Sequence, residues 1–496
     1  MILTEHLLNQ FIEVKGNVME RIHLYHTNDI HSHLSKWPRI AHYLREERTR
    51  IENSGDSFFA FDIGDACDRV HPLIEATNGT AMIDLMNDAH YDAVTIGNNE
   101  GIGSSKEQLN RLYDSANFKT IISNMRDAKS GELPKGTVPF EIFNTKKGHR
   151  IGIFALTASF PTSYIPIGWN IQDSFEVITQ MLEILEPLTD TIVLLSHLGI
   201  GDDRKIAEMF PMIDIILGSH THHVLPKGER IRDSLLGAAG RYGEYVGHVV
   251  IDVDENSIMD SSASVTPIDE IPAPFNEEEL IMAYSQKGHQ LLKQQQIAFL
   301  PKALPISWYA DSELMQISLE ALKYYAKTEA AVLNAGLFMT SLNDGVITND
   351  ELHQMLPHPM RILRVTLPGA ELIRVVEEME KNRHYLRKFP IRGMGFRGKY
   401  FGEIVYNGVS FDPTTGEVYW QGKSVRADRD YTFATVDHFM YIPFFPTIEL
   451  KGENELIFPL FIRNVVGQHL KKQYPLKQTK LDEELRNEGE QYDPNE

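Results

Sequence analysis

Between residue 21 and about residue 270, short apolar segments alternate with segments of helical periodicity. The apolar runs lie at 57–63, 91–96, 119–125, 150–157, 191–196, 213–217 and 246–253. Their length and their content of strand-forming residues are typical of buried strands. Helical periodicity appears between several of them, at 82–89 and 175–188. This alternation predicts sheets covered by helices, the layout of an α/β domain.

The pattern changes near residue 271. Ile271, Pro272, Ala273 and Pro274 indicate a rigid linker, and the acidic residues after Asn276 predict the capped first turn of a long helix. From about 300 to 475, predicted helices at 312–327 and 369–381 mix with strands at 361–366 and 432–436. We therefore predict a leader or disordered extension over 1–18, a first domain over 19–270, a linker helix over 271–300, a second domain over 301–476 and an acidic disordered tail over 477–496.

Composition limits the partners and the location. The 496 residues are 42% hydrophobic and 24% charged, with a formal net charge of −21, which predicts a soluble protein with more than one core. Without clustered Lys and Arg, this charge argues against nucleic acid as a partner. The single cysteine, Cys67, fits a reducing compartment, and no segment reaches the ~20 apolar residues of a membrane span. The first twenty residues lack the layout of a signal peptide. The sequence thus predicts a cytoplasmic protein with no membrane partner and leaves its oligomeric state open.

The first chemical signal lies at the end of the first predicted strand. Residues 21–27 alternate polar and apolar positions, and Asp29 and His31 follow where this strand ends. Two residues apart in extended backbone, their side chains would share one face, about 6 to 7 Å apart at Cα. A carboxylate oxygen and an imidazole nitrogen so placed predict two ligands of one divalent ion. By itself, such a pair is more often a solvated surface turn.

Further candidate ligands follow other predicted strands in the same way. Gly64, Gly97 and Gly218 precede three of them and allow the backbone to turn sharply. Because ligands bind at the C-terminal edge of the strands in open α/β sheets, we expect these side chains to gather there. The mixed oxygen and nitrogen set is too large for one tetrahedral ion and suits two ions that share a carboxylate. Its members are Asp29, His31, Asp65, Asn98, His197, His220 and His222.

These segments resemble a known family. The motifs at 27–33, 62–65, 96–98, 123–124, 195–199 and 216–222 are similar to those of the calcineurin-like metallophosphoesterases, in the branch of 5'-nucleotidases, 2',3'-cyclic phosphodiesterases and UDP-sugar hydrolases. The resemblance implies an N-terminal β-sandwich flanked by helices and a smaller α+β substrate domain. It also implies two divalent cations (Mn, Zn, Fe or Co) that activate a water for attack on phosphorus. By the same resemblance, one cation would be held by Asp29, His31 and His222, and the other by Asn98, His197 and His220. Asp65 would bind both cations.

The chain departs from this family at the catalytic dyad. The family has Gly-Asn-His-Glu and a nearby aspartate, whereas here Asn99 replaces the histidine and Ile102 the aspartate. Asn99, our predicted catalytic residue, can hydrogen-bond a phosphate oxygen but cannot supply a proton. General acid assistance contributes about 10²- to 10⁴-fold. We therefore predict activity on activated esters and diesters, with weak turnover of ordinary nucleoside monophosphates.

The second domain also departs from the family. Met339 stands where relatives have a substrate-binding arginine. The substrate contacts implied by the resemblance are Asn334, Phe401, Tyr441, Phe444 and Phe445. The leading prediction is a two-metal phosphoesterase that acts on a small, nucleotide-like phosphorylated substrate. The alternatives are a degenerate member that binds a phosphorylated ligand for sensing, and a hydrolase of another phosphorus or sulfur ester.

Overall fold

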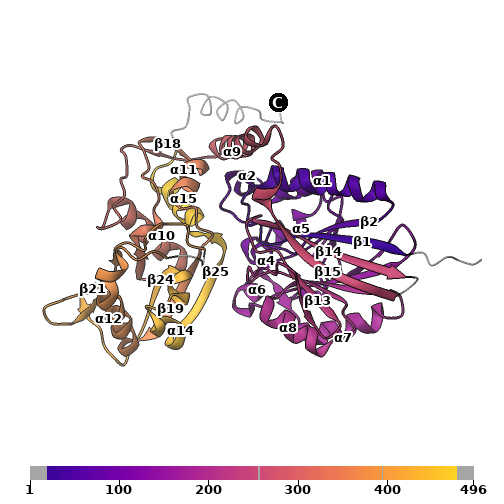
Figure 1. The fold of residues 1–496 in the computed structure, drawn as a ribbon. Coiled ribbons are helices and arrows are strands. Elements are labelled where there is room, and N and C mark those ends of the chain that lie inside the picture. The colour runs from indigo at the N-terminus through magenta and orange to yellow at the C-terminus, as the bar shows by residue number, and fades with distance from the viewer. Residues whose placement is uncertain (1–18, 255–256, 392, 394, 477–496) are drawn as a thin grey trace, which may run out of the picture. The chain divides into compact units, whose positions relative to one another are not determined.

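The computed structural model describes residues 19–254, 257–391, 393 and 395–476. Within these residues the chain forms two units, drawn in Figure 1. The first unit contains residues 19–68 and 78–283, and the second contains 69–77 and 284–476. The division falls within helix α9 (Glu277–Lys293), the long helix with an acidic first turn that the sequence predicts after Asn276. The predictions for 1–18 and 477–496 lie outside the described residues, and the predicted domain boundaries stay predictions.

The first unit is built on two large sheets. One has seven strands in the order β15-β14-β1-β2-β3-β4-β6, and the other has six in the order β12-β13-β11-β10-β8-β7. In the seven-stranded sheet, β1, β2, β3, β4 and β6 are parallel, and in the six-stranded sheet β8, β10, β11 and β13 are parallel. The bounds of the first sheet are β1 (Glu20–Thr27), β2 (Ser57–Asp62), β3 (Ala93–Thr95), β4 (Lys119–Ile121), β6 (Thr137–Val138), β14 (Tyr245–Asp254) and β15 (Ser257–Pro267). Those of the second are β7 (Phe140–Asn144), β8 (Arg150–Thr157), β10 (Thr191–His197), β11 (Ile215–Gly218), β12 (Glu229–Ile231) and β13 (Ser234–Ala238).

The core of the first unit lies between these two sheets. Leu24 and Phe61 from the seven-stranded sheet belong to one cluster with Val193 and Leu217 from the six-stranded sheet, and all four side chains are fully buried. Burial of each such side chain contributes about 1.5–3 kcal/mol. This packing confirms the helix-flanked sandwich that the family resemblance implies.

Helices cover the outer faces of the sandwich. Helices α7 (Ser174–Leu185) and α8 (Ile200–Met209) bury Val177, Ile178 and Ile206 in a cluster with residues of the six-stranded sheet. Figure 1 shows α1 (Trp37–Ser54) on the opposite side of the strands. The remaining helices of this unit are α3 (Thr80–Asp88), α4 (Asn98–Gly103), α5 (Lys106–Leu112) and α6 (Pro161–Ile167).

Two predicted segments have different bounds in the structure. The strand predicted at 119–125 ends at Ile121, and a short strand, β5 (Met125–Asp127), pairs instead with β9 (Trp169–Ile171). The interruption occurs because Ser123 and Asn124 bond to the backbone of β8: Ala155 N–H donates to Ser123 Oγ, and Thr157 N–H donates to Asn124 Oδ1. The helix predicted at 175–188 ends at Leu185, two residues before Pro187, which has no backbone N–H to continue the helical hydrogen bonds.

The second unit contains a five-stranded sheet in the order β20-β17-β24-β19-β25. The interior strand β17 is buried along its whole length. None of the helices in the described part of the chain is both long and apolar enough to cross a membrane. The strands of the unit are β16 (Gln296–Leu300), β17 (Ala330–Asn334), β18 (Gly345–Thr348), β19 (Arg361–Pro368), β20 (Ile404–Asn407), β21 (Val409–Phe411), β22 (Val418–Trp420), β23 (Lys423–Ser424), β24 (Asp430–Val436) and β25 (Glu453–Phe461). Its helices after α9 are α10 (Glu313–Ala326), α11 (Asn349–Met355), α12 (Gly369–Leu386), α13 (His438–Tyr441), α14 (Pro446–Lys451) and α15 (Ile462–Gln473).

A short segment from early in the chain belongs to this second unit. Residues 69–77 include helix α2 (Pro72–Ala76), whose Glu75 carboxylate accepts two hydrogen bonds from Arg463 of α15, at 3.1 and 2.6 Å. The Arg463 side chain is 3% exposed. The chain therefore passes between the two units three times, after Asp68, after Thr77 and after Ala283.

Candidate metal centre

The seven predicted metal ligands lie in loops that follow β1, β2 and β11, at the end of β10, and at the first residue of α4, which follows β3. Three backbone hydrogen bonds join the first two loops: Asp29 N–H to Gly64 O, His31 N–H to Asp65 O, and Ser32 N–H to Ala66 O, at 3.1, 2.8 and 2.9 Å. These bonds place the β1 loop directly beside the β2 loop. Side chains far apart in the sequence thus reach one edge of the sheets.

The backbone of these loops differs from the extended geometry that the sequence predicts at Asp29 and His31. Strand β1 ends at Thr27, and both residues have positive φ, 52° and 48°. Asp65, His220 and His222 also have positive φ. Left-handed backbone in a residue with a side chain is costly and is concentrated at functional sites. The two side chains therefore converge because the turn is tight, and the extended-strand explanation was wrong.

The first group of donors contains Asp29, His31 and His222. Oδ1 of Asp29 lies 3.7 Å from Nε2 of His31 and 3.5 Å from Nε2 of His222. The two imidazole Nε2 atoms are 3.2 Å apart. One carboxylate oxygen and two nitrogens therefore surround a common point, as one divalent cation requires.

The second group is arranged around His197. Its Nε2 lies 3.4 Å from Oδ1 of Asp65 and 3.2 Å from Oδ1 of Asn98, and the ring of His220 is centred 5.2 Å from its own. Nδ1 of His197 is 2.7 Å from the carbonyl of Ile63, to which it can donate a hydrogen bond. With the hydrogen on Nδ1, Nε2 keeps a lone pair for a cation.

One direct observation indicates that this set of donors suits a divalent cation. Asp29 is fully buried, and its Oδ1 has no hydrogen-bond partner among the described residues. The other oxygen, Oδ2, accepts from Ser219 Oγ at 2.7 Å and from Asn28 Nδ2 at 2.9 Å. A buried carboxylate oxygen without a donor costs free energy unless a cation binds it. The orphaned atom is the one that faces both histidines of the first group.

Neighbouring charges shift the pKa values within the set. Burial opposes ionisation of Asp29, but the close imidazole of His222 and nearby positive charge outweigh it and hold the pKa of Asp29 below its usual value. Burial also opposes protonation of His197, yet the charge of Asp65 outweighs burial and raises its pKa to about 10, so a cation that binds Nε2 displaces a proton from this ring. Burial lowers the pKa of His220. Burial likewise opposes ionisation of Asp65, but the charge of His197 outweighs it and lowers the pKa of Asp65. Both carboxylates are therefore ionised at neutral pH, the form that binds cations.

Gly97 allows the second group to assemble. A Cβ added to this residue would lie 2.1 Å from Oδ1 of Asp65. The φ of Gly97 is −87°, so the requirement for glycine comes from space and not from backbone strain. A side chain at position 97 would displace Asp65 from its place between the histidines.

Glu100 matches the glutamate of the family motif Gly-Asn-His-Glu but is not among the predicted site residues. Its buried carboxylate accepts hydrogen bonds from the backbone N–H groups of Gly97, Asp65 and Cys67, at 2.9, 3.0 and 2.7 Å. Burial and the nearby Asp65 raise the pKa of Glu100 to about 7. A signal is present in the sequence, because an acidic residue three positions after a helix N-cap is typical of a capping interaction. Glu100 thus ties the β2 loop to the start of α4.

Asn99 contacts a candidate ligand. Its Nδ2 lies 2.7 Å from Nδ1 of His31, and its backbone N–H donates to Oδ1 of Asp65, also at 2.7 Å. Asn99 thus lies at the metal centre, as the family resemblance implies. Its role as a catalytic residue stays a prediction.

The five predicted substrate contacts lie in the second unit, in different surroundings. Asn334 is buried and donates to the carbonyl of Phe401, whose ring packs against Phe445 in the core. Tyr441 is 49% exposed, and the partly buried Phe444 packs against the neighbouring ring of Phe389. Tyr441 and Phe444 therefore have accessible ring surface, whereas Phe401 and Phe445 serve as core residues. Substrate contact by all five stays a prediction.

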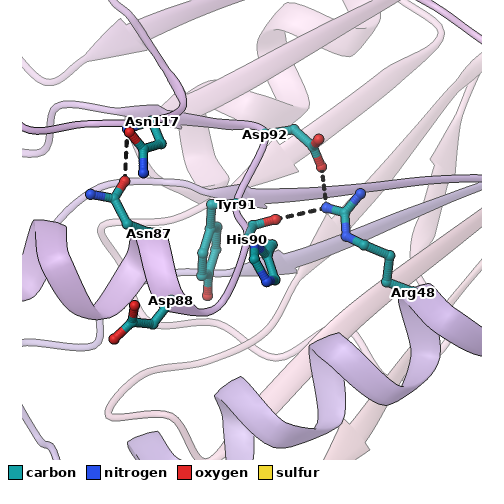
Figure 2. Close-up of a pocket in the computed structure, with 7 residues that line it drawn as sticks. All are labelled: Arg48, Asn87, Asp88, His90, Tyr91, Asp92 and Asn117. Carbon is teal, nitrogen blue, oxygen red and sulfur yellow. Dashed lines mark hydrogen bonds and ion pairs between the residues drawn. The ribbon is translucent and has the colours of Figure 1, made fainter.

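The first unit has a hollow of about 650 Å³ that none of the candidate ligands lines, and Figure 2 shows the residues that do line it. Arg48 pairs with Asp92 at 2.6 Å, and Asn87 accepts from the backbone N–H of Asn117 at 2.7 Å. Asp92 directly precedes β3, so the hollow lies where β3 begins and the metal centre where it ends. The residues that line the hollow are Arg48, Asn87, Asp88, His90, Tyr91, Asp92 and Asn117.

Comparison with known proteins identifies both halves of the chain. The calcineurin-like phosphoesterase family matches residues 22–224, and the 5'-nucleotidase C-terminal domain matches residues 296–441. An uncharacterized metallophosphoesterase of Bacillus subtilis, YunD, is 36% identical over 466 residues, which cover 91% of this chain and 99% of that protein. A snake venom 5'-nucleotidase of Crotalus adamanteus is 22% identical over 423 residues, covering 71% of this chain and 69% of that protein.

Solved structures share the fold. The 5'-nucleotidase precursor of Thermus thermophilus matches with a TM-score of 0.54 at 20% identity, covering 92% of this chain and 97% of that one. The NAD nucleotidase of Haemophilus influenzae matches with a TM-score of 0.63 at 15% identity, covering 92% and 97%. A family match for each half of the chain and a relative covered over 99% of its length thus point to the same family. The chain belongs to the calcineurin-like metallophosphoesterases, metal-dependent phosphoester hydrolases, in the branch that has a 5'-nucleotidase C-terminal domain.

Proposed function

We propose that this protein hydrolyses a small, nucleotide-like phosphoester with two divalent cations bound at the candidate metal centre. The observation that carries the proposal is the position of Asp65. Its Oδ1 is 3.4 Å from Nε2 of His197, and its Oδ2 is 3.8 Å from Nε2 of His31. One carboxylate thus faces nitrogen donors of both groups, which suits a ligand shared by two cations.

Each donor has a role in this proposal. Asp29, His31 and His222 would hold one cation, Asn98, His197 and His220 the other, and Asp65 both. When bound, Mn, Zn, Fe or Co cations supply Lewis acidity and lower the pKa of water. The protein's part is to hold the donors in place: Ser219 and Asn28 orient Asp29, and the carbonyl of Ile63 orients His197. Glu100 keeps the loop that contains Asp65 against α4.

The leaving group must depart without protonation by a histidine at position 99. Asn99 has no titratable proton, and Ile102 has no carboxylate, so this pair offers no general acid. Substrates with acidic leaving groups need no such help. We therefore propose faster turnover of activated esters and diesters than of nucleoside monophosphates. The names of the relatives, which include 5'-nucleotidases and an NAD nucleotidase, support a nucleotide-like substrate.

A cytoplasmic location is part of the proposal. Cys67 is the only cysteine in the sequence, and it is buried. A chain that uses no disulfide fits a reducing compartment. Fractionation of cells that express the full chain would test this location.

The test combines metal analysis with a substrate panel. The full chain is stripped of metal, reloaded with Mn, Zn, Fe or Co, and assayed with p-nitrophenyl phosphate, its bis ester, a 2',3'-cyclic nucleotide and AMP. Asp65→Ala removes the proposed shared ligand, and Asp233→Ala, in the exposed turn between β12 and β13, is the matched control. We expect the wild type to bind two cations per chain. We expect turnover to be lost in Asp65→Ala and to be retained in Asp233→Ala.

Two results would contradict the proposal. Bound metal without turnover of any ester that depends on Asp65 would favour a sensor of phosphorylated ligands. Hydrolysis of AMP and of p-nitrophenyl phosphate at equal rates would contradict the proposed dependence on the leaving group, because their leaving oxygens differ widely in basicity.

A further inference from the structure

Arg241 lies at the edge of the metal centre, on the turn between β13 and β14. The next residue, Tyr242, donates its backbone N–H to the carbonyl of Asp29 at 2.8 Å. The Arg241 guanidinium carbon lies 4.7 Å from the centre of the Tyr242 ring, and that ring lies 3.9 Å from the ring of His33. The turn that presents Arg241 is thus bonded to the backbone of a candidate ligand. Arg241 itself is exposed.

The guanidinium also contacts the centre directly. Nη1 of Arg241 lies 3.3 Å from Nδ1 of His222, while Nε2 of the same ring faces Oδ1 of Asp29 at 3.5 Å. An arginine only donates, so Nδ1 must accept this hydrogen bond. An imidazole whose Nε2 binds a cation carries its hydrogen on Nδ1 and has no lone pair there. The Arg241–His222 hydrogen bond and cation binding by Nε2 therefore exclude each other.

We propose that Arg241 binds the phosphoryl oxygens of the substrate, and of inorganic phosphate, once His222 serves as a ligand. This inference rests on the proposed function. A guanidinium offers five N–H donors in a plane and binds phosphate oxygens in pairs. Stacking on Tyr242 limits the positions of Arg241 without using its N–H groups. In a chain with a formal net charge of −21, this cation supplies a local attraction for an anion.

The position of Arg241 distinguishes it from other arginines of the same unit. Arg232 is also exposed, but it lies in the turn before β13, at the opposite end of that strand. Both residues have positive charge and solvent access, and they differ in distance along the strand from the candidate ligands. Arg232 is therefore the matched control for any general effect of charge.

The test measures phosphate binding and not activity alone. The full chain is loaded with Mn²⁺, and inorganic phosphate is titrated into the wild type, Arg241→Met, Arg241→Lys and Arg232→Met by calorimetry. Loss of a charge-assisted hydrogen-bonding pair weakens binding roughly tenfold or more, so we expect that increase in the phosphate Kd for Arg241→Met. Arg241→Lys retains part of the affinity, and Arg232→Met retains all of it. In turnover assays, KM rises for Arg241→Met while kcat stays within about twofold, as expected for lost ground-state binding.

Three results would overturn the inference. The first is a phosphate Kd for Arg241→Met within about twofold of the wild-type value. The second is a parallel loss of Mn²⁺ affinity in Arg241→Met, which would make Arg241 a support for His222 only. The third is a loaded wild type that binds no phosphate. Failure of the proposed function gives a different result. In that case neither the wild type nor Arg232→Met shows turnover that is lost in the Asp65→Ala variant.

Discussion

The side-chain amide of Asn99 lies 2.7 Å from Nδ1 of His31, so the residue that replaces the family's catalytic histidine contacts the metal centre through a candidate ligand. When the amide turns so that its oxygen faces Nδ1, Asn99 accepts the Nδ1–H of a His31 whose Nε2 binds a cation. Loss of a residue that orients a ligating histidine in this way costs about 10- to 100-fold in metal affinity or activity. We therefore expect Asn99→Ala to bind Mn²⁺ about 10- to 100-fold more weakly in a calorimetric titration. The backbone N–H of residue 99 still bonds to Asp65 in this variant, which isolates the side chain. Asn144→Ala, at the exposed end of β7, is the control; equal affinities in all three proteins would refute the orienting role.

The missing proton donor can be rebuilt. Positions 99 and 102 are three residues apart in α4, so their side chains lie on neighbouring parts of one helix face. We expect the double variant Asn99→His with Ile102→Asp to raise kcat/KM on AMP by about 10²-fold, with a much smaller gain on p-nitrophenyl phosphate. Asn99→His alone lacks the orienting carboxylate and should gain less. A gain of equal size on both substrates would show that the change does not act on the leaving group.

The close approach of Gly97 to Asp65 predicts a selective loss of metal binding. An alanine at 97 places its Cβ 2.1 Å from Oδ1 of Asp65, and that contact forces the carboxylate to move. Gly97 is the N-cap of helix α4. Gly103, the last residue of α4, has open space where a Cβ would be. We expect Gly97→Ala to lose metal and turnover and Gly103→Ala to keep both, measured by metal content per chain and by initial rates. Normal metal content in Gly97→Ala would mean that the loop accommodates a side chain.

Asp203 predicts a pH dependence of stability. Its buried carboxyl accepts a hydrogen bond from Ser196, and burial raises the pKa of Asp203 to about 8. In the unfolded chain the pKa is about 3.9, so the stabilising contribution of the protonated group is complete below about pH 4 and is lost as pH rises through about 8. We expect the Tm of the wild type to fall further between about pH 6 and about pH 9 than that of Asp203→Asn. Parallel curves would show that Asp203 keeps the same protonation state in the folded and unfolded chain.

The ion pair between Glu75 and Arg463 predicts a large loss of stability when broken. The two side chains are 14% and 3% exposed, and removing one partner of a buried pair costs about 3–5 kcal/mol. Glu75→Ala should therefore lower the denaturation midpoint strongly. The control is Asp428→Ala, which breaks an exposed pair with Arg426 whose side chains are 71% and 72% exposed, and exposed pairs contribute about 0–1 kcal/mol. Similar midpoints for the two variants would refute the structural importance of Glu75.

The gathering of most candidate ligands could be predicted from the sequence because each of them lies at the end of a strand or within a few residues after it. Strands are recognisable as buried apolar runs, and parallel strands bring their C-terminal ends to one edge of a sheet. Asp65, His197 and His220 can therefore be grouped from the amino-acid sequence alone. The left-handed backbone of Asp29 and His31 could not be predicted in this way, because it depends on hydrogen bonds to the β2 loop.

Other features depend on packing that a linear pattern does not contain. Arg241 follows no predicted motif, and its approach to His222 results from the turn that bonds to Asp29. Phe401 looks like any other aromatic residue in the sequence, and only the structure shows that its ring belongs to the core of the second unit. Residues 69–77 lie within the sequence range predicted for the first domain, whereas their contacts place them in the second unit.

The threefold passage of the chain between the units has a consequence for dissecting this protein. A fragment that begins at residue 284 lacks Glu75, and Arg463 would then be left buried without its carboxylate partner. A fragment that ends at 283 would contain α2 without the helices on which it packs. The N-terminal and C-terminal halves therefore cannot be exchanged by a single cut in the sequence. A chimaera with a relative must take residues 69–77 from the same protein as the C-terminal half.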